Sequence, residues 1–234
     1  MITLDYLLSH SNLPGPRGNL ELLHSFAKEA EPGVVGKCLG CIREDTANSP
    51  EEFAGMCGIV GYAMLHRDDI PGTFAFLRTF ASHDSWRIRE AVAIAVQEIA
   101  VGKMNEVLEG FRDWTEGNPL EQRAVVAALC EPKLLKNPEI NRKILEILRK
   151  ITDGFHGSEK LTESRKVLRQ SLGYGWSVVV AHQPEEGRKA LESYTGTSGG
   201  HIRWIVMENL KKNRLVKMDP KWVEQMKAAF DGSA

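Results

Sequence analysis

The stretch Asp84-Ser85-Trp86-Arg87-Ile88-Arg89-Glu90-Ala91-Val92-Ala93-Ile94-Ala95-Val96 decides the fold of this chain. It opens with Asp84, a small polar residue that can cap a helix, and Arg89 follows five residues later. The part from Ala91 to Val96 is apolar around the whole circumference of a helix. Such a helix must be covered by neighbours on several sides, so the stretch predicts a buried helix among stacked helices.

The same pattern recurs along the chain. Successive arginines of the pattern are 34, 46 and 34 residues apart. A repeat of about 35–45 residues containing two helices is the signature of an α-solenoid, because one repeat cannot bury its apolar face without the next. We expect a ladder in which each cap accepts a hydrogen bond from the guanidinium group of a neighbouring repeat. The four pairs of cap and arginine are Asp84 with Arg89, Asn118 with Arg123, Ser164 with Arg169, and Ser198 with Arg203.

Helix starts indicate the same organisation. Ser49, Asn118 and Asn137 each precede a proline, which costs little at the first position of a helix. We expect one helix of each pair to begin near Ser49, Asp84, Asn118, Ser158 and Ser198, with Ser158 as the alternative to Ser164. The second helices are expected near residues 70–82, 103–116, 138–152 and 184–194.

These signals predict an all-α chain, an α–α superhelix of about five to six antiparallel helix pairs. We expect a single domain over residues 1–234. Its parts are an N-terminal capping segment at 1–31, repeats over 32–215 and a C-terminal capping helix at 216–234.

Residues 84–93 resemble the HEAT-repeat pattern, with an aspartate, an aliphatic–arginine pair and then small residues on the second helix. Residues 118–127 repeat it with Gln122 in place of the aliphatic residue, and Ile202-Arg203-Trp204 resembles it again. The resemblance covers roughly residues 30–230 and implies an armadillo-like solenoid. The chain is also similar to bacterial and archaeal HEAT-repeat proteins without an assigned chemistry, through segments 13–22, 129–135 and 208–215.

The chain is distantly similar to the DNA alkylation repair glycosylases, the HEAT-like family with known catalysis. That resemblance implies DNA held on a concave face by basic side chains, and a base pocket lined by two tryptophans and an aspartate. Asp113 and Trp114 are adjacent, and neighbours on a helix point about 100° apart rather than into one pocket. This departure from the family's spacing argues against glycosylase activity but not against a DNA-binding surface. Because the sequence also contains no nucleophile, nucleotide-binding or dinucleotide-binding motif, we predict no catalytic residue.

Composition is that of an ordinary globular protein. Thirty Lys+Arg and 31 Asp+Glu give a net charge of −1, and 42% of the residues are hydrophobic. This excludes a disordered chain and a polybasic tail. No apolar run approaches the ~18–20 residues of a membrane span, no secretory signal is visible, and four cysteines do not make a disulfide framework. We expect a cytoplasmic protein with no membrane association.

Charge is divided unevenly along the chain. Residues 1–120 carry a net charge of −7 and residues 121–234 a net charge of +6. We expect a non-enzymatic scaffold whose concave face binds a macromolecule, in the first place a protein, because arginine and tryptophan are common interface anchors. DNA or RNA bound by the basic C-terminal half is the alternative, and a solvated face with a structural arginine ladder is the third interpretation. The candidate binding residues are Arg89, Arg123, Arg169, Trp176, Arg203, Trp204, Lys211, Lys212 and Arg214, and the structural caps are Asp84 and Asn118.

Three further motifs have structural interpretations. Cys38 and Cys41 form a lone C-x-x-C, too few ligands for zinc, so we predict apolar packing, no metal and no cofactor. Glycines at every third position from Gly55 to Gly61 predict close helix packing. The Gly173-Tyr174-Gly175 segment predicts a bend in a helix, or access of a partner to Trp176.

Overall fold

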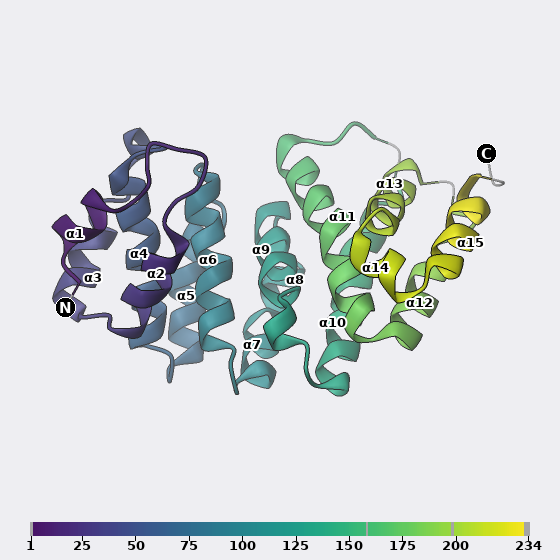
Figure 1. The fold of residues 1–234 in the computed structure, drawn as a ribbon, viewed down its shortest axis with the longest axis horizontal. Helices are drawn as coiled ribbons and strands as arrows, with labels where there is room; N and C mark the ends of the chain where they lie inside the picture. Colours follow the sequence, from purple (N-terminus) through teal and green to yellow (C-terminus); the bar gives the residue numbers. More distant parts are fainter. Residues whose placement is uncertain (1, 158, 198, 232–234) are drawn as a thin grey trace. The chain divides into compact units, whose positions relative to one another are not determined.

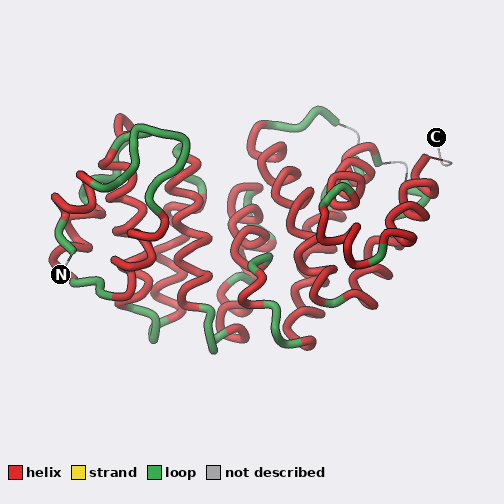
Figure 2. The backbone as a smooth tube through the Cα atoms, viewed as in Figure 1, coloured by secondary structure: helices red, strands yellow, loops and turns green. Residues whose placement is uncertain are grey.

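The structure is a computed structural model that describes residues 2–157, 159–197 and 199–231. These ranges contain fifteen α-helices, two short 3-10 helices and no strand, which confirms the all-α prediction (Figures 1 and 2). Contacts divide the chain into two compact units, Met1–Phe111 and Arg112–Ala234. No helix of the described residues is both long and apolar enough to cross a membrane.

The first unit is built around helix α4, which packs against α1, α2, α3 and α6. Helix α5 contacts α6 and α7, so alternate helices of the unit form two layers. The elements are α1 (Leu4–Ser9), α2 (Leu20–Lys28), α3 (Pro32–Leu39), a 3-10 turn (Glu44–Thr46), α4 (Pro50–Leu65), α5 (Ile70–Ala81), α6 (Trp86–Ile99) and α7 (Met104–Gly110).

Three glycines let α4 approach its neighbours closely. A Cβ on Gly58 would lie 2.7 Å from the backbone nitrogen of Leu39, and a Cβ on Gly61 would lie 2.9 Å from the Val35 side chain. Gly55 faces Ile42 in the same way, at 2.7 Å. The predicted close helix packing is confirmed.

The cap of α6 differs from the prediction by one residue. The Ser85 hydroxyl accepts hydrogen bonds from the backbone nitrogens of Arg87 (3.1 Å) and Ile88 (3.3 Å), so Ser85 is the cap and the prediction of Asp84 is wrong. The guanidinium group of Arg89 donates to the carbonyls of His83 (2.5 Å) and Asp84 (2.7 Å). Asp84 thus contributes its backbone to the loop before the helix.

The second unit is built around the long helix α11, which contacts α9 and α13 as well as α10, α12 and α14. Helices α9, α11 and α13 form one layer, and α10 contacts α12 in the other. The elements are α8 (Arg112–Thr115), α9 (Pro119–Leu129), a 3-10 turn (Pro132–Leu134), α10 (Pro138–Asp153), α11 (Glu163–His182), α12 (Pro184–Glu192), α13 (Gly200–Leu210), α14 (Asn213–Met218) and α15 (Pro220–Asp231).

Two glycines place α11 between α9 and α13. A Cβ on Gly175 would lie 2.8 Å from Sγ of Cys130, which follows α9, and a Cβ on Gly173 would lie 2.9 Å from the Trp204 ring on α13. Residues two apart on a helix point about 200° apart, so the glycines serve opposite sides of α11. Close packing accounts for both, and the helix continues through them to His182.

Helix starts in the second unit agree with the prediction at Asn118 and depart from it further on. Asn118 caps α9, which confirms the prediction, and it also forms a capping box with Glu121. Helix α11 begins after Thr162, whose hydroxyl accepts from the Arg165 nitrogen at 3.3 Å, so Ser164 lies inside the helix and is not its cap. The other two predicted starts, Ser158 and Ser198, lie outside the described residues.

One predicted helix is divided in two. The stripe over residues 103–116 forms α7 and α8, with a break at Phe111. Gly110, just before the break, lies against the Phe74 ring, where a Cβ would come within 2.8 Å. Glycine is a poor helix former, and this contact accounts for its use here.

Candidate functional site

Four cations and one amide line an open hollow at the turn between α13 and α14. Its volume is about 480 Å³, and no carboxylate belongs to its lining. The predicted residues Lys211, Lys212 and Arg214 come together here, joined by Asn213 and Lys217.

The turn that carries these cations is fixed to α11 by buried residues. Asn209 is fully buried, and its side-chain amide donates to the Leu172 carbonyl (2.9 Å) and accepts from the Ser177 nitrogen (2.7 Å). Leu215 in α14, which follows the turn, is also fully buried. The cations therefore project from a held backbone rather than from a free loop.

Most charges of the hollow lack a counter-ion. Lys211 pairs with Glu208 one turn earlier. Lys212, Arg214 and Lys217 have no carboxylate partner among the described residues. Like charges held together without counter-ions attract anions, so the hollow is suited to bind phosphate or carboxylate groups.

Tyr174 stands beside the hollow with half of its surface exposed. Its hydroxyl accepts a hydrogen bond from Nη2 of Arg214 at 2.5 Å, and the Arg214 guanidinium carbon lies 4.7 Å from the ring centroid. The Lys212 ammonium lies 5.8 Å from the same centroid. These contacts hold the ring at the side of the cations.

A second arginine–aromatic stack lies on the seam between α11 and α13. The Arg169 guanidinium carbon lies 4.3 Å from the centroid of the half-buried Trp204 ring. Arg169 also bonds to Nδ1 of His201 at 3.0 Å, and Nε2 of His201 lies 3.0 Å from the Glu159 carbonyl. Because arginine only donates, Nδ1 accepts and Nε2–H donates to the carbonyl.

The remaining predicted residues lie elsewhere. Trp176 is fully buried and donates through Nε1 to the Thr152 hydroxyl at 3.0 Å, so the prediction of an accessible anchor is wrong. Arg123 on α9 and Arg203 on α13 are half-buried, engaged with other groups, and do not line the hollow. Arg89 belongs to the first unit, where its guanidinium group donates to the carbonyls of His83 and Asp84 and is engaged with other groups as well.

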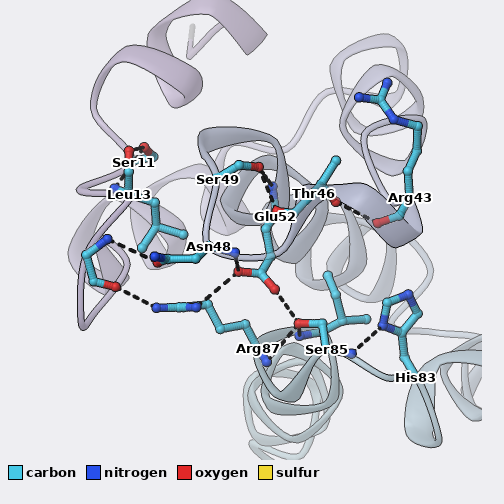
Figure 3. A network of polar contacts seen from close by, with 12 residues as sticks. Ser11, Leu13, Arg43, Thr46, Asn48, Ser49, Glu52, His83, Ser85 and Arg87 are labelled. Carbon is cyan, nitrogen blue, oxygen red and sulfur yellow. Dashed lines mark hydrogen bonds and ion pairs between the residues drawn. The ribbon is translucent and has the colours of Figure 1, made fainter.

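A buried ion pair in the first unit was not predicted from the sequence (Figure 3). Nη1 of Arg87 lies 3.1 Å from Oε2 of Glu52, and the Ser85 hydroxyl donates to the other carboxylate oxygen. Glu52 also accepts from the Asn48 nitrogen at 2.8 Å, and Nη2 of Arg87 donates to the Gly15 carbonyl at 2.7 Å. The pair therefore joins α4, α6 and the loop between α1 and α2.

That loop has a further contact with the start of α4. The Gly15 nitrogen donates to the side-chain oxygen of Asn48 at 3.1 Å. Glu52 lies in the first turn of α4, where the helix dipole favours an acid, but its ion-pair partner lies 35 residues away. The network pairs the two buried charges and links α4, α6 and the loop between α1 and α2, while Nε of Arg87 is buried without a hydrogen-bond partner, so we assign the network a structural role.

The cysteines do not form a metal site. Within the described ranges, no three His, Cys, Asp or Glu side chains are grouped to hold an ion. Cys38 and Cys57 are fully buried, and burial raises the pKa of the Cys38 thiol to about 12 and that of Cys57 well above its usual range. Both pack as small apolar side chains, which confirms the prediction for Cys38, whereas Cys41, for which the same packing was predicted, is only partly buried.

Comparison with protein-family models, with curated proteins and with solved structures finds no match for this chain. The resemblance to HEAT repeats rests on the sequence pattern alone.

Proposed function

We propose that this chain is a HEAT-like helical scaffold that binds nucleic acid through the basic hollow at the α13–α14 turn. The observation that carries the proposal is the group formed by Lys212, Arg214 and Lys217, three cations without carboxylate partners among the described residues. We also propose a cytoplasmic location, because the four cysteines are free thiols, as expected in a reducing compartment.

The charge of each unit supports a polyanionic ligand. Residues 112–234 carry 21 Lys+Arg and 16 Asp+Glu, whereas residues 1–111 carry 9 and 15. A polyanion approaching the second unit is therefore attracted by its net charge, and the hollow concentrates that attraction at one place.

The lining of the hollow favours nucleic acid over a protein partner. Energetically dominant centres of protein interfaces are apolar or aromatic pockets, and charged residues are depleted there. The five residues that line the hollow are cationic or carry an amide: Lys211, Lys212, Asn213, Arg214 and Lys217. Phosphate groups match such a lining because each can accept hydrogen bonds from lysine and arginine.

The test is fluorescence anisotropy with a labelled 20-nucleotide strand and a 20-base-pair duplex at about 50 and 200 mM salt. The variant K212Q/K217Q is compared with K136Q/K189Q, which removes the same charge from exposed lysines elsewhere in the second unit. We expect the first variant to weaken binding at least tenfold and to lower the salt slope by about 2, because each phosphate contact contributes about 1. The control should stay within about twofold.

Two results would overturn the proposal. One is no binding of either nucleic acid at about 50 mM salt. The other is equal binding and equal mutational loss with poly-glutamate, which would assign the hollow to an acidic protein partner.

A further inference from the structure

We propose that the ligand of this hollow is single-stranded nucleic acid, with a base stacked on the pair formed by Tyr174 and Arg214. The inference rests on the proposed function and names the class of nucleic acid. It depends on a different observation, an aromatic ring held half-exposed beside the cations.

The Tyr174 ring is positioned before any ligand arrives. Its hydroxyl is bonded to Arg214 at 2.5 Å, and the guanidinium group lies near the ring face, 4.7 Å from the centroid. Tyr174 lies in the middle of helix α11, between Gly173 and Gly175, which pack against α13 and α9. A planar group in a fixed place loses little entropy when a base stacks on it.

The surroundings of the ring supply the phosphate contacts that stacking needs. Lys212 lies 5.8 Å from the ring centroid, and it lines the hollow together with Arg214. A strand that places a base on Tyr174 would thus have its backbone beside the cations. Combinations of aromatic faces and a basic groove bind single strands without strong sequence preference.

A second aromatic group lies next along the same seam. The ring of Trp204 touches Gly173, the residue before Tyr174, and carries Arg169 on its face at 4.3 Å. Trp204 is half-buried, so Tyr174 is the principal stacking surface and the Arg169 stack extends the seam. Guanidinium planes also stack on bases, so the neighbouring stack offers a second contact to the strand.

A duplex cannot stack a base on the Tyr174 ring. Its bases are stacked on one another, and only its phosphates and base edges are accessible. Duplex binding would depend on the lysines and Arg214 of the hollow alone, whereas single-strand binding would add the stacking contribution of Tyr174.

The experiment uses the full chain and three labelled probes of equal length: a dT 20-mer, an abasic 20-mer with the same phosphates, and a 20-base-pair duplex. We expect the wild type to bind the dT strand at least tenfold more tightly than the abasic strand. Tyr174→Leu should weaken dT binding about 5- to 100-fold, down to the abasic level, and leave duplex binding within about twofold. Tyr174→Phe keeps the ring and should stay within about threefold of wild type.

The outcomes separate this inference from the proposed function. Equal binding of the dT and abasic strands, or unchanged dT binding by Tyr174→Leu, overturns stacking. In that case a loss in K212Q/K217Q would still support nucleic-acid binding by the hollow. Absence of binding to all three probes overturns both. Because Tyr174 is half-exposed, its variants should unfold near the wild-type midpoint, which circular dichroism can verify.

Discussion

The carboxylate of Glu52 and the guanidinium group of Arg87 lie 3.1 Å apart inside the first unit, where the two residues are only 2% and 6% exposed. Arg87 reaches past this partner to the Gly15 carbonyl, so one side chain of α6 holds both α4 and the loop between α1 and α2. Burying an ion pair is costly, and the additional hydrogen bonds of both partners offset that cost.

Breaking this pair should destabilise the first unit strongly. Glu52→Gln leaves the Arg87 charge buried without a counter-ion, so we expect a loss of about 3–5 kcal/mol in the free energy of unfolding. Denaturant unfolding followed by circular dichroism measures it. Asp68→Asn, which breaks the exposed pair with Lys103, is the control and should leave the midpoint nearly unchanged. Similar midpoints for the two variants would show that the buried pair does not stabilise the fold.

The contact between α3 and α4 offers a pair of matched glycine substitutions. Gly58→Ala places a Cβ 2.7 Å from the Leu39 backbone nitrogen, which cannot move aside as a flexible side chain can, so we expect a loss of about 1–3 kcal/mol. Gly36→Ala lies in α3 with nothing within 4 Å and should stabilise the chain by about 0.5–1 kcal/mol. Thermal unfolding of both variants measures the difference. A harmless Gly58→Ala would mean that the two helices are separated further than the structure shows.

The features that the sequence predicts are those that depend on neighbouring residues or on periodicity. Asn118 is predictable as a cap because its proline and Glu121 stand at fixed offsets. The glycines from Gly55 to Gly61 are predictable because their spacing places them along one side of a helix.

Features that depend on distant residues escaped prediction. The partner of Glu52 is 35 residues away and no local pattern indicates it. Trp176 looks like an interface anchor in the sequence, but Thr152, 24 residues earlier, receives its hydrogen bond inside the core. Of the predicted binding residues, Lys211, Lys212 and Arg214 lie together because they share one turn, whereas the arginines of the repeat pattern do not join them.

Thiol reactivity should follow burial. Cys38, Cys57 and Cys130 are buried, with the pKa of each thiol raised chiefly by desolvation, so at about pH 8 they hold almost no thiolate. We expect a disulfide reagent to modify only the partly exposed Cys41 in the folded chain, and slowly, because its pKa is also raised. In denaturant all four thiols should react. If the reagent rapidly modified thiols in the folded Cys41→Ser variant, the buried positions of Cys38, Cys57 and Cys130 would be contradicted.

The same burial predicts a loss of stability in alkaline solution. The pKa of Cys38 is raised from near 9 to about 12 in the folded chain, so the folded state keeps a proton that the unfolded chain releases. The stabilisation is complete below pH 9 and is lost as the pH rises from there towards about 12. Denaturant midpoints should therefore fall between pH 9 and pH 11, and by less in Cys38→Ala. An equal fall in the variant would assign the alkaline loss to other groups.

Removing one carboxylate should strengthen anion binding by the hollow. Glu208 pairs with Lys211, the one lining cation with a carboxylate partner among the described residues, so Glu208→Gln would free that lysine for a phosphate. We expect strand binding about two- to fivefold tighter and a salt slope steeper by up to about one, measured by anisotropy across a salt series. Glu224→Gln is the matched control, because Glu224 forms the same i,i+3 pair with Lys227 on α15 and the variant changes the net charge equally. If both variants tighten binding to the same extent, the effect comes from net charge and Lys211 makes no direct contact with the ligand.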